Sequence, residues 1–278
     1  MVGEGAGRPD GAGRDEVRRF GEVSEEHEGL TYGSYLKIPD LLSLQALLSD
    51  PPAHDELLFI VVHQAYELWF KELLFELESI RDLLARGELP RARHFLQRVH
   101  VIERLLVEQI PVLETMTPQD FLEFRSNLSP ASGFQSVQFR EIEVVSGLKR
   151  PGLVRALAKA PGDRERMERR LAEPTLWEAF CEVLEAHGLP MPADDDEVRR
   201  KSLLAMARDP DHLQLFELSE ALLTHDELFA LWRHRHVLMV ERQIGSKTGT
   251  GGSSGSSYLR GTLDQRFYPE LWELRSLL

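Results

Sequence analysis

The feature that most limits how this chain can fold is a long helical repeat of apolar residues between Ala53 and Arg86. Apolar side chains recur there at spacings of three and four, which places them on one face of an α-helix. Pro51 and Pro52 precede the segment and Gly87 follows it, as start and stop signals do. Such a helix would extend about 51 Å at about 1.5 Å per residue, so it would span a whole domain.

Most of the remaining chain also has a helical period, and no stretch alternates between turn signals as a strand would. We expect a second long helix over residues 90–116, bent at Pro111, and a short helix with Thr117 as its N-cap. Further helices are expected at 135–146, 151–160, 163–172, 175–187, 195–208, 211–244 (interrupted near 224–226) and 268–277.

This pattern predicts an all-α fold, a bundle of long helices forming one domain over residues 30–278. Residues 1–29 are rich in Gly, Asp, Glu and Arg and lack an apolar period, so they are predicted to be a disordered N-terminal tail.

Charge and cysteine content limit the classes of partner. The net charge is −13, whereas nucleic acids and anionic membranes attract a surplus of Lys and Arg. The lone Cys181 excludes an intramolecular disulfide framework and suits a reducing compartment. No apolar run approaches the ~20 residues of a membrane span, and the N-terminus lacks the apolar core of a secretory signal. We expect a cytoplasmic protein with no nucleic-acid or membrane partner.

Two histidines occupy apolar helix faces. His63 shares a stripe with Phe59 and Tyr66, and His236 shares one with Trp232. Each could be a core histidine that hydrogen-bonds inside the fold. Alternatively, a neutral imidazole framed by apolar side chains is what an axial haem ligand requires. A zinc site would need three or four close ligands, which the sequence does not bring together.

Arg125 lies on an apolar stripe with Phe121 and Leu128. A buried guanidinium needs an anion, because leaving it unpaired is costly. That anion could be a carboxylate of the fold itself, or the carboxylate of a substrate held by two parallel hydrogen bonds.

The segment GSKTGTGGSSGSS, residues 245–257, contains no apolar side chain. It departs from the spacing of the common phosphate-binding motifs and no strand precedes it, so a nucleotide site is not expected. Two interpretations remain: a flexible linker, or a mobile loop that closes over a pocket next to the helix carrying His236.

Five segments, taken in order, resemble the tryptophan 2,3-dioxygenase family. They are LTYGSYL (30–36), FIVVHQAYELWFKELLFE (59–76), FLEFRSNLSPASGFQSVQFR (121–140), WRHRH (232–236) and GSKTGTGGSSG (245–255). The resemblance runs from about residue 30 to the end and is weakest over 155–200. It implies an all-α fold of the haem-dependent dioxygenase type, a homotetramer with one haem b per subunit, and cleavage of the indole 2,3-bond of L-tryptophan by O2 to N-formylkynurenine.

The resemblance also implies roles for individual residues. His236 matches the axial iron ligand, and His63 matches the distal histidine beside the indole N–H, as an orienting partner rather than an obligatory base. Phe59 matches the aromatic residue that packs on the indole. Phe121 stands where some bacterial relatives carry Tyr, so its packing role is retained while a hydroxyl contact is absent.

Three further residues match family positions at or near the polar end of the substrate. Arg125 matches the partner of the substrate carboxylate, Thr250 a contact to the charged end of the amino acid, and Ser132 a serine near the distal pocket. Tyr32 and Tyr35 match a segment that reaches toward a neighbouring subunit's site. From the residues alone two other functions stay open: a haem- or tryptophan-binding sensor without turnover, and a helical interaction protein.

Overall fold

The computed structural model describes residues 29–152, 161–251 and 255–278. The chain divides into two units, Met1–Ala46 and Leu47–Leu278. In the first unit, α2 (Tyr32–Tyr35) and α3 (Ile38–Leu41) are single-turn helices. The predicted tail, except for residue 29, and the core of the helix predicted over 151–160 lie outside the described residues. The domain boundary at residue 30 stays a prediction.

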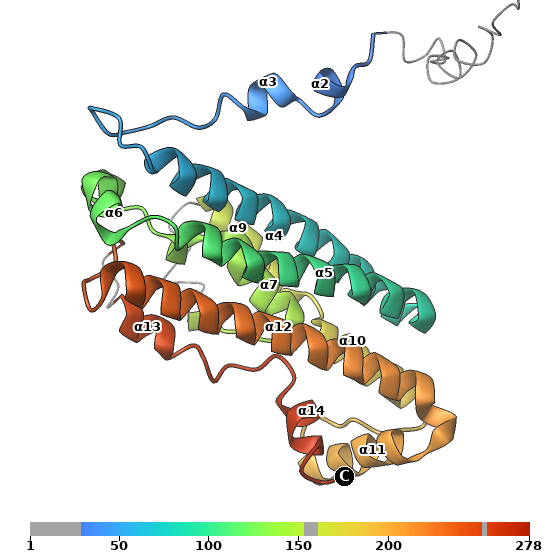
Figure 1. Cartoon of the computed structure of the whole chain (residues 1–278). Helices are drawn as coiled ribbons and strands as arrows, with labels where there is room; N and C mark the ends of the chain where they lie inside the picture. The colour runs from blue at the N-terminus through green and yellow to red at the C-terminus, as the bar shows by residue number, and fades with distance from the viewer. Residues whose placement is uncertain (1–28, 153–160, 252–254) are drawn as a thin grey trace, which may run out of the picture. The chain divides into compact units, whose positions relative to one another are not determined.

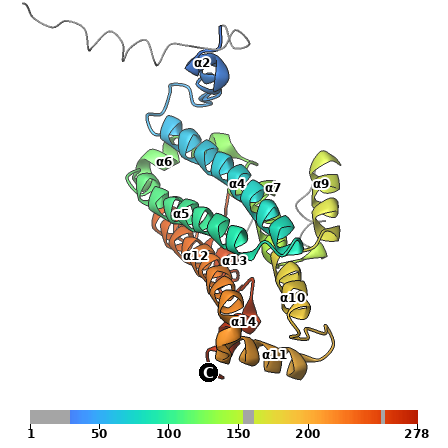
Figure 2. The ribbon, with the colours of Figure 1, turned by 90° about the vertical axis from the view of Figure 1, so that its right-hand side faces the viewer.

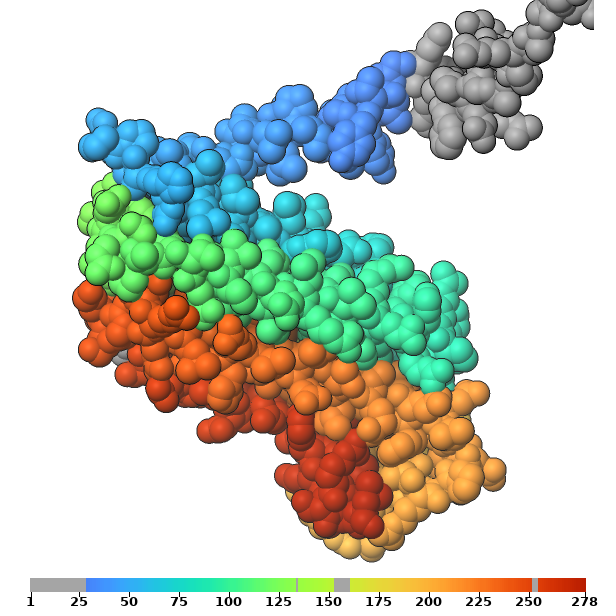
Figure 3. Space-filling model, in the orientation of Figure 1, coloured from blue at the N-terminus to red at the C-terminus, as the bar shows by residue number. Residues whose placement is uncertain are grey.

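Three long helices form the body of the second unit. They are α4 (Glu56–Ala85), α5 (Leu89–Leu113) and α12 (Leu213–Ile244). α5 lies between the other two and packs extensively against both (Figures 1 and 2). In the space-filling view the three helices form successive bands on one face (Figure 3). Their inward faces carry fully buried side chains from each helix, among them Leu77, Leu96 and Leu218.

The remaining helices cover this body. α7 (Val137–Ser146) and α10 (Leu176–Ala186) pack against α4, and α9 (Pro161–Ala172) packs against α7. The others are α6 (Pro118–Arg125), α11 (Asp196–Arg208), α13 (Ser256–Arg260) and α14 (Pro269–Leu274). No strand occurs in the described ranges, so the predicted all-α class is confirmed. Within those ranges no helix is long and apolar enough to cross a bilayer.

Helix boundaries follow local hydrogen bonding. Thr117 caps α6 as predicted: its hydroxyl accepts the Asp120 N–H at 3.2 Å, and the Asp120 carboxylate accepts the Thr117 N–H at 3.1 Å. α4 begins at Glu56, later than predicted, because the buried Glu56 carboxylate holds the preceding segment in a turn. It accepts the N–H groups of Leu48 and Ser49 at 2.7 and 3.0 Å.

The interruption of α12 predicted near His225 is wrong, because the helix is continuous. The two polar residues at the predicted break, His225 and Asp226, are fully buried and hydrogen-bond to distant partners. His225 Nδ1 lies 2.6 Å from Glu103 Oε1 and its Nε2 lies 2.9 Å from the Ser146 hydroxyl. One Asp226 carboxylate oxygen accepts three hydrogen bonds from residues 267–272. Polar residues that signal a helix break in isolation are tolerated here because tertiary contacts pair them.

Candidate functional site

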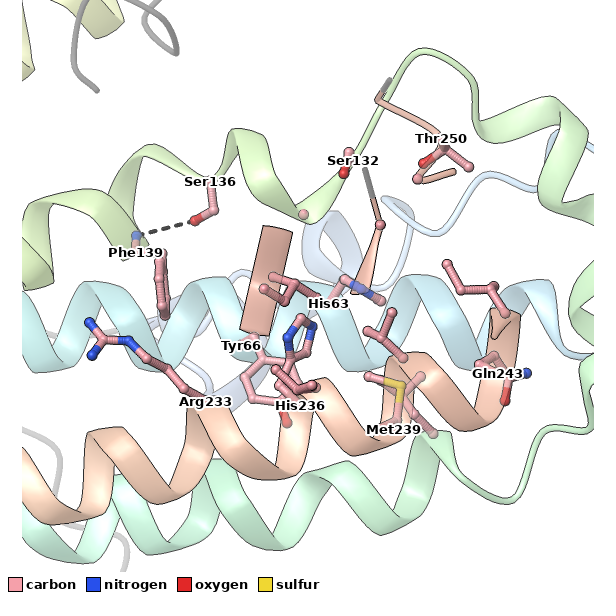
Figure 4. Close-up of a pocket in the computed structure, with 18 of the residues that line it drawn as sticks. His63, Tyr66, Ser132, Ser136, Phe139, Arg233, His236, Met239, Gln243 and Thr250 are labelled. Atoms are coloured by element: carbon pink, nitrogen blue, oxygen red, sulfur yellow. Dashed lines mark hydrogen bonds between the residues drawn. The ribbon is translucent and has the colours of Figure 1, made fainter. Parts of the chain in front are cut away.

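A cavity of about 250 Å³ opens between α4, α7, α12 and two loop segments. His63 from α4 and His236 from α12 both line it. Figure 4 shows these two histidines near the middle of the cavity, with Ser132 and Thr250 together at one edge and Arg233 beside Phe139 on the other side. The packing of α4 and α12 on either side of α5 therefore brings residues far apart in sequence to one site.

His236 is held as a neutral imidazole. Burial lowers its pKa to about 4, and the nearby His63 adds to that shift, so the ring is uncharged near neutral pH. The ring stacks on Trp232, with centroids 4.9 Å apart and planes 9° apart. Among the described residues, none hydrogen-bonds a ring nitrogen of His236. A neutral, unbonded imidazole in a largely apolar cavity fits the ligand that haem iron requires.

A closed metal cage does not fit the same residues. Over the described ranges, no group of three or more His, Cys, Asp and Glu side chains gathers as metal ligands.

The ring of His63 makes a hydrogen bond within the fold, and this bond decides which ring nitrogen carries the proton. Its Nδ1 lies 2.7 Å from the Phe59 carbonyl oxygen. Because a carbonyl can only accept, Nδ1 carries the proton, and in the neutral ring Nε2 is a bare acceptor. Burial lowers the pKa of His63 and so favours that neutral form, although the Phe59 carbonyl opposes the shift. The site therefore contains a fixed hydrogen-bond acceptor.

Aromatic rings wall the cavity on the His63 side. The Phe59 ring lies 4.0 Å from the His63 ring and 5.8 Å from the Phe121 ring, with Phe59 and Phe121 stacked at 27°. Phe124 packs edge-on against both phenylalanines. This wall offers a flat apolar surface next to the acceptor nitrogen, which suits an aromatic ligand that carries an N–H donor.

Arg125 ends α6 and points toward the glycine-rich loop. Its Nη2 donates to the Thr248 carbonyl oxygen, and its Nε is buried without a partner within the described chain. No described carboxylate forms an ion pair with Arg125. The alternative of a carboxylate partner from within the fold is therefore not what the structure shows. The Arg125 guanidinium lines the cavity.

The described parts of the glycine-rich loop fold back over the cavity. The Thr250 hydroxyl donates to the Ala131 carbonyl at 2.6 Å, and the Ser129 hydroxyl donates to the Thr250 carbonyl at 3.4 Å. A Cβ on Gly251 would lie 2.7 Å from the Ser132 Cβ, so only glycine allows this close approach. These contacts do not fit a free linker, and they bring Thr250 and Ser132 to the cavity edge.

The cavity also contains polar residues that sequence analysis did not identify. Glu143 accepts hydrogen bonds from Arg140 at 2.6 Å and from Arg233 at 2.8 Å, and all three are buried. Tyr258, just after the loop, lines the same end. The Arg140–Glu143 spacing of three on one helix was the available local signal. The sequence around Arg233 contains no such local signal, because its partner Glu143 is 90 residues away.

Tyr32 and Tyr35 lie in the first unit, on α2, and neither is buried there. Their side chains are 78% and 71% exposed. Their implied approach to a neighbouring subunit's site stays a prediction.

Fold and site together define an all-α protein with an aromatic-walled cavity set between two neutral histidines. The chain belongs to the tryptophan 2,3-dioxygenase family, whose model matches residues 18–186 and 199–278. A relative named tryptophan 2,3-dioxygenase from a Nocardioides species is 57% identical over 265 residues, covering 93% of this chain and 98% of the relative. Relatives of the same name from Herpetosiphon aurantiacus and Bacillus anthracis are 45% and 40% identical, over 90% of this chain in each case.

The close approach of Gly251 to Ser132 generates a prediction about loop docking. Gly251→Ala introduces a Cβ where there is no room, so the loop should undock, and Lys247, which is already exposed, should then lie in a segment flexible enough to fit the active site of trypsin. We expect faster tryptic cleavage after Lys247, followed by mass spectrometry. Gly133→Ala is the matched control, since a Cβ there meets nothing within 4 Å. Equal cleavage rates in both variants would contradict the docked arrangement.

Proposed function

We propose that this protein is a haem-dependent tryptophan 2,3-dioxygenase, which adds both atoms of O2 across the indole 2,3-bond of L-tryptophan to give N-formylkynurenine. The observation that carries the proposal is the shared cavity of His63 and His236, with an aromatic wall on one side and Arg125 at its edge. The names of the relatives support turnover over a sensor that only binds.

The residues of the cavity suit haem b. His236 would hold the iron through a ring nitrogen, and Trp232, Met239 and Val240 would pack beside the porphyrin. Arg140 and Arg233 share the single carboxylate of Glu143, which leaves a net positive charge at the polar end of the cavity for the carboxylates of the cofactor. Haem, when bound, supplies the O2 chemistry, and the protein supplies orientation. We propose one haem per subunit.

The distal residues would fix the indole ring. His63 Nε2 is the acceptor that the indole N–H requires, because its Nδ1 is already committed to the Phe59 carbonyl. The rings of Phe59 and Phe121 would pack against the indole. His63 therefore acts as the orienting residue at the reacting ring and need not remove a proton. Phe121 has no hydroxyl to offer the substrate, so its contribution is packing.

The charged end of tryptophan would bind at the cavity edge. Arg125 supplies the guanidinium for the carboxylate, and its present contact with the Thr248 carbonyl would be shared or replaced. Thr250 and Ser132 lie at the same edge. Anchoring the substrate at both its ring and its carboxylate restricts its motion, which is the positioning contribution to catalysis. Closure of the loop would also exclude water from the site.

Exposed apolar side chains support the proposed homotetramer. On α4 and α5 they recur at spacings of four and seven, which places them in a stripe on each helix. Such stripes mark protein–protein interfaces. The stripes are Leu57, Val61, Leu68 and Phe75 on α4, and Val101, Leu105 and Val112 on α5. The exposed Tyr32 and Tyr35 would reach a neighbouring subunit's site, and the free, half-buried Cys181 suits the proposed cytoplasmic location.

The dioxygenase and the sensor differ in one measurement. L-tryptophan is added to the reduced, haem-loaded protein in air, and N-formylkynurenine is followed by its absorbance. We expect product to form in stoichiometric excess over protein. A tryptophan-induced spectral change without product would instead support the sensor.

Replacing the proposed iron ligand should remove the cofactor. His236→Ala is expected to purify without the Soret band, because within the described chain no other imidazole lies at that position of the cavity. His234→Ala is the control: it is two residues away on the same helix but exposed, so its Soret band should match wild type. Retention of a normal spectrum by His236→Ala would rule out this ligand.

Replacing Arg125, the proposed partner of the substrate carboxylate, should weaken substrate binding and leave haem in place. A charge-assisted hydrogen-bonded contact contributes about 1.5–3 kcal/mol, so Arg125→Ala should raise the Kd for L-tryptophan roughly 10- to 100-fold. Arg125→Lys keeps the positive charge but cannot form two parallel hydrogen bonds, so its Kd should lie between those of wild type and Arg125→Ala. Tryptamine, which lacks the carboxylate, should bind all three proteins alike. Unchanged tryptophan affinity in Arg125→Ala would refute the proposed contact of Arg125 with the substrate carboxylate.

The protonation of His63 should shape the pH profile. Only the neutral ring accepts the indole N–H, so kcat/KM should be lost as pH falls through the pKa of His63. Because burial lowers that pKa, we expect the acid limb below the ordinary histidine value of about 6.5. His63→Gln retains an acceptor that does not titrate and should lose this limb. An unchanged limb in His63→Gln would assign it to another group.

A further inference from the structure

The His236 ring is contacted in a way that is unusual for a histidine proposed to bind a metal. Histidines that bind metals are ordinarily oriented by a hydrogen bond from the other ring nitrogen to a carbonyl or carboxylate. In the part of the chain that the structure describes, His236 makes no such bond. Its ring instead lies face to face with the Trp232 indole, one helical turn earlier on α12, with planes only 9° apart.

Trp232 is itself held by aromatic rings from three helices. The rings of Tyr66 and Phe70 on α4 meet it edge-on, with centroids at 6.1 and 6.5 Å and planes 74° and 82° apart. Phe139 on α7 and Phe229 on α12 lie 5.1 and 6.2 Å from it. Contacts from several directions leave the indole little freedom to rotate.

This aromatic cluster is also tied to the third long helix. The Tyr66 hydroxyl donates a 2.8 Å hydrogen bond to the Leu106 carbonyl oxygen on α5. Tyr66 and Trp232 are thereby fixed relative to all three helices of the bundle. The plane of the indole is set by the core of the fold, and the His236 ring follows that plane.

We propose that Trp232 is a positioning residue, which fixes the rotation of the His236 imidazole about its Cβ–Cγ bond and so the plane that the ring presents to the cofactor. This inference rests on the proposed role of His236 as the iron ligand. Trp232 acts through His236 and replaces the hydrogen bond that orients ligand histidines elsewhere. A flat face at position 232 is the property that matters, more than the volume of the side chain.

The test uses the haem-loaded full chain in its ferric, cyanide-bound form. The g values of this low-spin species report the orientation of the axial imidazole plane, which a purely structural residue would not change. Trp232→Leu should shift the g values from those of wild type, whereas Trp232→Phe, which keeps a flat ring, should stay close to them. Haem content and Tm are measured on the same samples.

Phe229→Leu is the matched control. Phe229 belongs to the same aromatic cluster and the same helix, is buried, and does not line the cavity. It should lower the Tm while leaving the g values as in wild type. Wild-type g values in Trp232→Leu, or the same shift in Phe229→Leu, would overturn the proposal.

Two outcomes separate this inference from the proposed function. If His236→Ala loses the Soret band and Trp232→Leu keeps wild-type g values, the ligand stands and the positioning role fails. If His236→Ala keeps the band, the ligand assignment itself fails.

Should Trp232→Leu not retain haem, Trp232→Phe and Trp232→Met are compared, since both retain bulk but only Phe retains a flat face. A shift confined to Met supports the proposal, and identical g values in the two variants would overturn it.

Discussion

The site depends on the packing of α4 and α12 against opposite sides of α5. This arrangement sets the distance between His63 and His236 and leaves a cavity between them. Both rings are kept neutral because burial lowers their pKa values. An imidazolium would be unable to bind a metal or to accept a hydrogen bond, so the burial that stabilises the bundle also sets the chemistry available in the cavity.

The groups proposed to bind the charged end of tryptophan lie on connections instead of on the long helices. Arg125 ends a two-turn helix, Ser132 lies in the loop that follows, and Thr250 lies in the glycine-rich loop. Their mutual placement depends on short contacts such as that of Gly251 with Ser132. The rigid helices thus hold the proposed cofactor site, whereas the parts that must admit and release a substrate belong to segments with few buried contacts.

The sequence was informative wherever a property depended on local periodicity. The long helices, the apolar faces of His63 and His236, and the Thr117 cap were all predictable, because each depends on residues three to four apart. The continuity of α12 through His225 was not, since Glu103 and Ser146, which satisfy that side chain, lie on other helices. The sequence likewise left open what Arg125 would contact, because a backbone carbonyl from the distant glycine-rich loop has no signature of its own.

The two histidines that line the cavity are suited to different tasks by the other contacts that their rings make. The hydrogen bond from His63 Nδ1 to the Phe59 carbonyl fixes the tautomer and leaves Nε2 as an acceptor. His236 is oriented by stacking, which fixes the plane of the ring without drawing on either nitrogen. A carboxylate partner would make a ligand imidazole more basic, and stacking avoids that change. The proposed iron ligand would therefore act as a neutral donor, while the distal histidine recognises an N–H, and the difference arises from the neighbours of each ring.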